Sequence, residues 1–365
     1  MKFLVLGRFI FHAAEMELIM PWTTVEVEKQ DKFIIEDDEQ SGRIISYKDA
    51  LYEALDQSLE RDSRVFVMGE GIDDIGGVFG TTKGLNEKYG GHRVFDTPIA
   101  ENSLTGIAAG AAMAGLRPVL VHARMDFLLL SFDQLVNHAS KWSYMTGGEV
   151  SVPLVVRTIS ARGWGSGAQH SQCIHGMLMN VPGLKIAVPA TPYDAKGLLI
   201  SSIIDNNPVL FVEHRWLYKT MGKVPDTLYS IPFGKGVVRR KGSDVTIVAI
   251  SYMVIEALKA AQKLETENIS VEVIDLRTIK PIDEDIIIES LTKTGRLIIS
   301  DTGAKTGGVA SEVAAIAAEK ALDLLKKPIL RVCCPDTPTP TSDVLEKAYY
   351  PDADTICNAV RELLK

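Results

Sequence analysis

The chain has 365 residues, of which 46% are hydrophobic and 24% are charged, the ordinary balance of a globular protein. This length favours two domains, each large enough to bury a core. The 39 basic and 47 acidic residues give a net charge of −8, which argues against a nucleic-acid or anionic-membrane binder. Four cysteines at irregular spacing do not suggest a disulfide framework or a zinc site.

The first 43 residues predict an N-terminal arm, of which residues 28–43 are expected to be solvated. An apolar run near the start resembles a signal peptide, but Glu15 and Glu17 stand where small residues are needed for cleavage. No stretch has the roughly 18 apolar residues that span a bilayer. The sequence therefore predicts a cytoplasmic protein.

From residue 44 onward, apolar runs alternate with helical patterns. Continuously apolar strands joined by helices are typical of a parallel sheet with helices on both faces. The strands of this first domain, 44–220, are expected near 64–69, 118–122, 153–157, 184–189 and 209–213, with helices at 48–60 and 194–204.

Residues 221–243 are rich in Gly, Pro and charge, and they predict a linker. A second alternation of strand and helix follows within 244–365, which predicts a doubly wound α/β domain. Its strands are expected at 245–250, 271–275, 296–300 and 329–333, and its helices at 252–265, 283–293 and 308–325.

The common nucleotide and metal motifs do not occur. The loop GEGIDDIGGVFG at 69–80 has no third glycine at the spacing of a dinucleotide fingerprint, and no phosphate-binding GxxxxGK[ST] is found. There is also no HExxH, CxxC or GxSxG segment. NAD, ATP and catalytic zinc are therefore unsupported, and the loop predicts a flexible turn.

Two segments carry candidate site residues. Glu101 stands at the start of a predicted helix in which Gly106, Gly110 and Ala114 recur every four residues. This pattern allows close contact with another helix, which could belong to a second subunit. Residues 127–148 predict one amphipathic helix that ends at a double glycine. His170 lies in a glycine-rich loop, and such a histidine is more often a surface residue than a catalytic one.

Six segments occur in order along the chain: TPIAE (97–101), SFDQLVNHASK (131–141), QHSQ (169–172), PGLK (182–185), DAKGLL (194–199) and DNNPV (205–209). With them, residues 44–360 resemble the beta subunit of the thiamine-diphosphate-dependent decarboxylase component of 2-oxoacid dehydrogenase complexes. DTPTPTSDVLEKAYYPD (336–352) resembles the C-terminal signature of that family. The resemblance implies a pyrimidine-binding domain followed by a transketolase C-terminal-like α/β domain.

The resemblance also implies the roles of single residues. Glu101 would hydrogen-bond a ring nitrogen of the aminopyrimidine of thiamine diphosphate and start its activation, and Phe127 would pack on that ring. His170 would face the reacting carbon, where it could donate to an oxyanion or assist transfer to a lipoyl group. A structural potassium ion is implied at Leu154, Ser202, Ile203, Asp205 and Asn207.

A missing segment also fits the resemblance. Complete thiamine enzymes carry a GDG segment that binds magnesium and the diphosphate, and this sequence has none. The family's alpha subunit supplies that half of the site, so an alpha2-beta2 heterotetramer is implied. The expected reaction is decarboxylation of a 2-oxo acid with acyl transfer to a lipoyl group. The alpha subunit is the implied partner, and a lipoyl acyltransferase core could be a further one. The alternative is a split transketolase-like or carboligase subunit that passes a two-carbon unit to an aldehyde or sugar.

The sequence departs from the family at 121–124. Val121 replaces a glutamate that similar beta subunits often have, and Arg124 replaces an aromatic residue. Arg124, His122 and Arg162 could together present positive charge to an acidic or phosphorylated substrate. Pairing of Arg124 with a carboxylate of the partner chain is an equal alternative.

Overall fold

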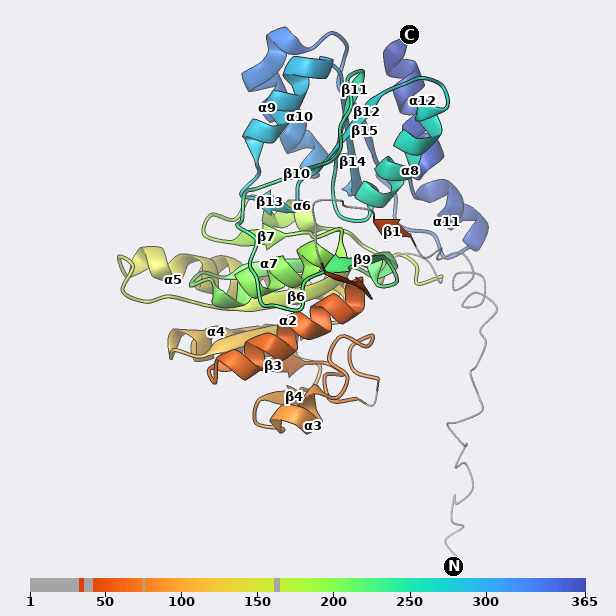
Figure 1. Cartoon of the computed structure of the whole chain (residues 1–365). Coiled ribbons are helices and arrows are strands. Elements are labelled where there is room, and N and C mark those ends of the chain that lie inside the picture. Colours follow the sequence, from red (N-terminus) through yellow and green to blue (C-terminus); the bar gives the residue numbers. More distant parts are fainter. Residues whose placement is uncertain (1–32, 36–41, 75, 161–164) are drawn as a thin grey trace, which may run out of the picture.

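The computed structural model describes residues 33–35, 42–74, 76–160 and 165–365, and these form two α/β domains, one above the other in Figure 1. The lower domain is built on a seven-stranded sheet in the order β13-β7-β8-β6-β5-β3-β4. All neighbouring pairs are parallel except β13 with β7. The strands are β3 (Val65–Gly69), β4 (Val94–Asp96), β5 (Arg117–His122), β6 (Val155–Ser160), β7 (Lys185–Ala187), β8 (Val209–His214) and β13 (Thr278–Lys280).

Helices cover both faces of this sheet. Helices α2 (Tyr47–Arg61) and α7 (Pro192–Ile204) pack against each other on one face, and α4 (Glu101–Met113) lies on β5 at the other. Ser46 caps α2 by accepting from the Asp49 amide, and Thr191 caps α7 in the same way. The shorter elements are α3 (Leu85–Tyr89), η1 (Met125–Ser131), η2 (Asp133–Ala139), α5 (Ser140–Met145), α6 (His175–Leu178) and η3 (Arg215–Leu217).

The upper domain has a five-stranded sheet in the order β10-β12-β11-β14-β15, parallel except for the edge strand β10. Helices α8 and α12 pack together on one face, and α9 and α10 on the other. The elements are β10 (Val237–Arg240), β11 (Val245–Ala249), α8 (Met253–Glu265), β12 (Val271–Asp275), α9 (Glu284–Thr294), β14 (Leu297–Ala304), α10 (Val309–Ala321), η4 (Leu322–Leu324), β15 (Leu330–Cys334), α11 (Asp343–Tyr349) and α12 (Ala353–Leu364).

The predicted fold class is confirmed, and every strand and helix predicted for the upper domain is present within a few residues. The single amphipathic helix predicted at 127–148 is wrong. That segment divides into the 3-10 helix η1, the π-helix η2 and the short α5. Interruptions of this kind are frequent at functional sites, and the hydrogen bonds described below fix η1 at its two ends.

The N-terminal arm lies largely outside the described residues. Within it, β1 (Ile34–Ile35) pairs with β9 (Met221–Val224), and β9 also pairs with β2 (Arg43–Ser46). Ile35 is buried and Ile34 is 51% exposed, so Ile35 is packed against the domain and is not solvated. The predicted linker 221–243 contains β9 and β10, each paired in a sheet. The division at 220 and 243 stays a prediction.

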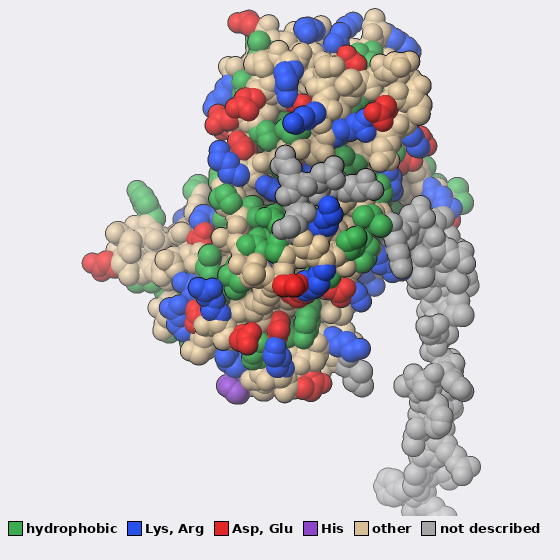
Figure 2. Space-filling model, viewed as in Figure 1, with side chains coloured by type: hydrophobic (Ala, Val, Ile, Leu, Met, Phe, Trp, Pro, Cys, Tyr) green, Lys and Arg blue, Asp and Glu red, His purple; other side chains and the backbone are tan. Residues whose placement is uncertain are grey.

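The two domains share their cores. One cluster of buried apolar side chains joins α2 and α7 of the lower domain to α8 and α12 of the upper domain, and a second joins α4 and η1 to α9 and α10. On the face seen in Figure 2, acidic and basic side chains are interspersed over both domains. No helix among the described residues is long and apolar enough to cross a bilayer.

A buried cluster of four charges also links the domains. Asp194 in the first turn of α7 forms ion pairs with Arg239 of β10 and with Arg277, whose Nε lies 2.9 Å from Asp194 Oδ1. Arg239 Nη2 lies 2.9 Å from Oδ2 of Asp275 at the end of β12. Burial favours the neutral form of Asp194, but Arg239 and Arg277 outweigh it and lower the pKa of Asp194.

The variant Asp194→Asn is expected to destabilise the protein by about 3–5 kcal/mol, because it leaves buried guanidinium charge without its carboxylate. The control Asp226→Asn removes the carboxylate of an exposed ion pair with Arg43 and is expected to cost at most about 1 kcal/mol. Urea unfolding of both variants measures the difference. Equal small effects would contradict a structural role for the buried cluster.

Candidate active site

Glu101 occupies the first turn of α4, after the N-cap residue Ala100. The residue is only 5% exposed, and no hydrogen bond or ion pair joins its carboxylate to another described residue. The positive end of the helix dipole favours a negative charge at this position. The structure therefore holds a buried carboxylate whose hydrogen-bonding capacity is available to a ligand.

Two further carboxylates, Glu70 and Asp96, stand at the carboxyl ends of β3 and β4, and Glu70 is close enough to Glu101 and to Asp96 to be affected by both charges. Asp96 Oδ1 accepts from the amide of Gly71 at 2.6 Å. The pKa of Glu70 is raised, first by burial and then by the negative charges of Glu101 and Asp96. The sequence reading missed Glu70 because it treated 69–80 as a flexible loop. The carboxyl ends of adjacent parallel strands were the available signal.

The backbone of Glu101 is fixed by a small buried network. Its carbonyl oxygen accepts from Thr105 Oγ1 at 2.7 Å and from Ser131 Oγ at 3.0 Å. Nε2 of His122 lies 3.1 Å from Thr105 Oγ1 and 3.2 Å from Ser131 Oγ. The end of β5, the end of η1 and the start of α4 are thereby tied together around Glu101.

The expectation that His122 presents positive charge is wrong. Its ring is 2% exposed, and burial lowers its pKa to about 4, so the imidazole is neutral at pH 7. Val121 is buried within β5. Arg162 lies outside the described residues.

Arg124 differs from His122, because its guanidinium keeps its charge beside an aromatic ring. Its Cζ lies 5.9 Å from the ring centroid of Phe79. The Cζ of Arg215 lies 4.0 Å from the same centroid. Arg124 Nη1 is buried and has no hydrogen-bond partner among the described residues. Both predicted roles, substrate contact and pairing with a partner chain, stay open.

Phe127 and His170 are brought together. Their rings meet edge to face with centroids 5.3 Å apart, and Phe127 is 37% exposed on η1. Asp126, which the sequence reading missed, joins η1 to the segment that follows His170. Its Oδ1 accepts from the amide of Gln172 at 3.1 Å and from Gln172 Nε2 at 3.0 Å. Because η1 also bonds Glu101 through Ser131, the three predicted site residues belong to one connected region.

Of the small residues of α4, Gly106 serves a contact within the chain. A Cβ on Gly106 would lie 3.1 Å from Gln134 Oε1 of η2, so glycine allows η2 to approach. A Cβ on Gly110 would meet no described atom within 4 Å. Ile107 on the same helix is 61% exposed and Ile99 is 77% exposed. A subunit contact at this exposed face stays a prediction.

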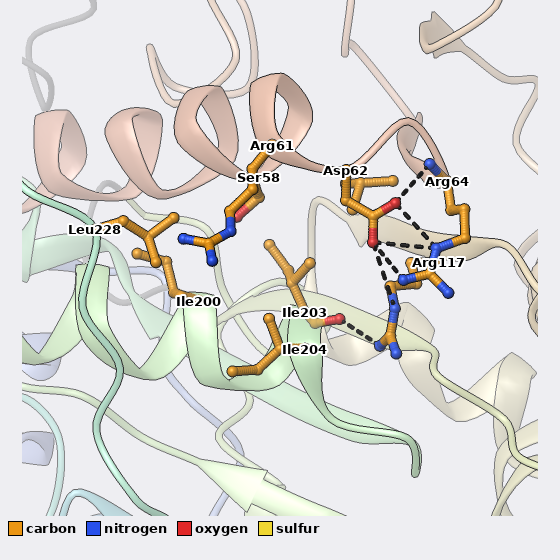
Figure 3. Close-up of a pocket in the computed structure, with 10 residues that line it drawn as sticks. Ser58, Arg61, Asp62, Arg64, Arg117, Ile200, Ile203, Ile204 and Leu228 are labelled. Carbon is orange, nitrogen blue, oxygen red and sulfur yellow. Dashed lines mark hydrogen bonds and ion pairs between the residues drawn. The ribbon is translucent and has the colours of Figure 1, made fainter.

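Of the residues implied for potassium, Ser202, Ile203, Asp205 and Asn207 lie in the last turn of α7 or just after it, and Leu154 directly precedes β6. Arg117 Nη1 donates to the carbonyl oxygens of Ile203 at 2.9 Å and Asp205 at 3.0 Å, and Figure 3 shows it beside Ile203. The Leu154 carbonyl accepts from the Val209 amide, and the Asp205 carboxylate pairs with Lys185. Two of the implied carbonyl ligands therefore already contact a cationic side chain.

The variant His122→Gln is expected to flatten the dependence of stability on pH. A histidine in the unfolded chain has a pKa near 6.5. Between this pH and about 4, the unfolded state therefore binds a proton at His122 and the folded state does not. This difference in pKa contributes about 3 kcal/mol to the free energy of unfolding. The contribution is present above pH 6.5 and is lost as the pH falls towards 4.

Urea unfolding at pH 7.5 and 4.5 compares wild type, His122→Gln and the exposed control His92→Gln. The loss of stability on acidification is expected to be smaller in His122→Gln than in the other two proteins. An unchanged loss would mean that His122 is not held neutral.

Comparison with known proteins identifies both domains. The family "Transketolase, pyrimidine binding domain" matches residues 43–221, and "Transketolase, C-terminal domain" matches residues 234–356. A solved structure described as "Split gene transketolase, inactive beta4 tetramer" is 25% identical, with a TM-score of 0.70 over 88% of this chain and 98% of that one.

Curated relatives are closer in sequence. The beta subunit of acetoin:2,6-dichlorophenolindophenol oxidoreductase from Bacillus subtilis is 44% identical over 88% of this chain and 98% of its own length. The 2-oxoisovalerate dehydrogenase subunit beta of the same organism is 42% identical, with the same two coverages. The pyruvate dehydrogenase E1 component subunit beta of Rickettsia felis is 43% identical over 87% of this chain and 98% of its own length. The chain therefore belongs to the transketolase-like family of thiamine-diphosphate-dependent 2-oxoacid dehydrogenase E1 beta subunits.

Proposed function

We propose that the chain is the beta subunit of a two-chain thiamine-diphosphate enzyme that decarboxylates a 2-oxo acid and transfers the acyl unit to a lipoyl group. The observation that carries the proposal is the buried Glu101 carboxylate, which has no side-chain partner in the described part of the chain. It lies in the region that also holds an exposed aromatic ring and an imidazole. Relatives named as pyruvate and 2-oxoisovalerate dehydrogenase subunits support it.

These residues fit the pyrimidine half of thiamine diphosphate. Glu101 would bind a ring nitrogen and hold a proton there, and the hydrogen bonds to its carbonyl oxygen would keep α4 in place. Phe127 would pack on the ring and exclude water from it. When bound, the cofactor supplies a nucleophilic carbon and the electron sink for decarboxylation.

His170 would act on the substrate. Its ring is oriented by the edge contact with Phe127, and Asp126 holds the following Gln172 in place. From there an imidazole could donate a hydrogen bond to an oxyanion that forms on the substrate, or assist transfer of the acyl unit to a lipoyl group.

The diphosphate and its magnesium ion would be held by an alpha subunit, in an alpha2-beta2 heterotetramer in the cytoplasm. The absence of a GDG segment supports this division. A lipoyl acyltransferase core is a further proposed partner. A potassium ion, if bound as the resemblance implies, would share the Ile203 and Asp205 carbonyls with Arg117, since each carbonyl oxygen has two lone pairs.

Acetoin cleavage is a second candidate. Two relatives, 44% and 43% identical, are named as beta subunits of acetoin:2,6-dichlorophenolindophenol oxidoreductase. Their identities are so close to those of the 2-oxoacid dehydrogenases that sequence similarity does not separate the substrates. The split transketolase alternative receives less support, because that relative is only 25% identical.

The variant Glu101→Gln, reconstituted with the alpha subunit, is expected to lose about 10²–10⁴-fold in turnover, because the amide cannot hold the proton at the ring nitrogen. The matched control Glu87→Gln, in exposed α3, is expected to retain activity. Pyruvate, a branched-chain 2-oxo acid and acetoin are assayed with a lipoyl acceptor or with 2,6-dichlorophenolindophenol, and a ketose is assayed with an aldehyde acceptor. Full activity of Glu101→Gln would overturn the role of Glu101, and turnover of the ketose alone would overturn the proposed reaction.

A further inference from the structure

A second group of reactive side chains lies three residues beyond His170. Sγ of Cys173 is 3.0 Å from Nδ1 of His175 and 3.1 Å from Oγ1 of Thr302. Cys173 is partly exposed and lines a cavity of about 510 Å³. The cavity lies between the loop that follows His170 and the segment 334–339 of the upper domain.

His175 is held by a buried carboxylate on its other side. Its Nε2 lies 3.1 Å from Oδ1 and 3.2 Å from Oδ2 of Asp301, and both side chains are at most 1% exposed. Burial opposes protonation of the ring, but the charge of Asp301 and the neighbouring Cys173 outweigh it and raise the pKa of His175 well above its usual value. The sulfur therefore lies beside an imidazolium.

This order of thiol, imidazole and carboxylate is that of an activated nucleophile oriented by a third group. It crosses the domain junction, because Asp301 lies in β14 and His175 begins α6. One more polar group of the cavity wall is unsatisfied: the Ser171 hydroxyl is buried and has no partner among the described residues. A purely structural ion pair of His175 and Asp301 would need neither the thiol nor the opening to the cavity.

We propose that Cys173 is a reactive thiol that is modified by small uncharged electrophiles such as hydroperoxides. This modification site is separate from Glu101 and Phe127. The imidazole of His175 lies within hydrogen-bond distance of the attacking sulfur and is held there by Asp301. With a hydroperoxide, an S–O bond forms and the O–O bond breaks. The leaving oxygen takes a proton, so that cysteine is oxidised to sulfenic acid and the peroxide is reduced to water or an alcohol.

The charges around the cavity select the electrophile. Among the described residues that line the cavity, Asp336 is the charged one, and it adds a negative charge to that of Asp301. The single imidazolium does not balance these charges. An anionic reagent is therefore repelled relative to a neutral reagent of the same size.

The other cysteines are poor competitors. Burial, and then the negative charge of Asp301, raise the pKa of Cys333 to about 12, and burial raises the pKa of Cys357. Cys334 is 2% exposed. Asp301 thus has opposite effects on its two neighbours, since it favours the imidazolium beside Cys173 and disfavours a thiolate at Cys333.

Timed alkylation of the full chain with iodoacetamide at pH 7, alone and with its alpha subunit, tests the proposal by peptide mass spectrometry. Cys173 is expected to react at least about tenfold faster than Cys333. The ratio of the alkylation rate with iodoacetamide to the rate with iodoacetate should be higher for Cys173 than for the thiol of glutathione. Hydrogen peroxide followed by dimedone should label Cys173. These measurements use no thiamine diphosphate and do not rest on the proposed function.

Variants separate the arrangement from simple exposure. Asp301→Asn and His175→Asn are each expected to slow alkylation of Cys173 at least about fivefold, since each weakens the positive charge beside the sulfur. The control Cys333→Ser should leave the rate unchanged. Circular dichroism identifies the variants that fold. If neither variant folds, the relative alkylation rates of Cys173 and Cys333 in the wild-type protein test the proposal. Slower reaction of Cys173 than of Cys333, or wild-type rates in a folded Asp301→Asn or His175→Asn protein, would overturn the proposal.

Discussion

The buried charges of Asp194, Arg239, Asp275 and Arg277 are the constraint on which the relation of the two domains depends. Two carboxylates and two guanidinium groups are removed from water together, so each needs the others in place. Around them, β13 of the upper half of the chain joins the lower sheet beside β7. The cores that run through both domains reinforce the same arrangement. The two domains are therefore joined by ion pairs, by strand pairing and by shared apolar packing.

The functional region uses this arrangement in two ways. Within the lower domain, strand ends and the first turn of α4 bring Glu70, Asp96 and Glu101 to one edge of the parallel sheet. Across the junction, Asp301 of β14 reaches His175 and so orients the imidazole beside Cys173. The first group supports the proposed binding of the cofactor ring. The second exists only when the upper domain is docked.

Much of the architecture could be predicted from the sequence, because continuously apolar strands and capped amphipathic helices are local signals. The strands of the upper domain and the start of α4 at Glu101 are examples. The pairing of β13 with β7 could not be predicted, since three residues carry no sign of a partner about 90 residues away. The break of 127–148 into η1, η2 and α5 depends on hydrogen bonds from Ser131 and Asp126 to distant segments.

The candidate site shows the same division. Glu101, Phe127 and His170 could be named through ordered motifs, but their roles needed the family resemblance. From the sequence alone, His122 is expected to contribute positive charge. Its burial beside Thr105 and Ser131 shows that it is neutral. Asp126 and Asp301 carry no motif. Their contacts arise from segments that are 46 and 126 residues apart in the chain.

The central claim is that this chain supplies the pyrimidine half of a thiamine diphosphate site and a partner supplies the diphosphate half. Isothermal titration calorimetry with thiamine diphosphate and magnesium tests it most directly. The isolated chain is expected to show weak or no binding, and the chain mixed with its alpha subunit is expected to bind tightly. Tight binding by the isolated chain would contradict the account.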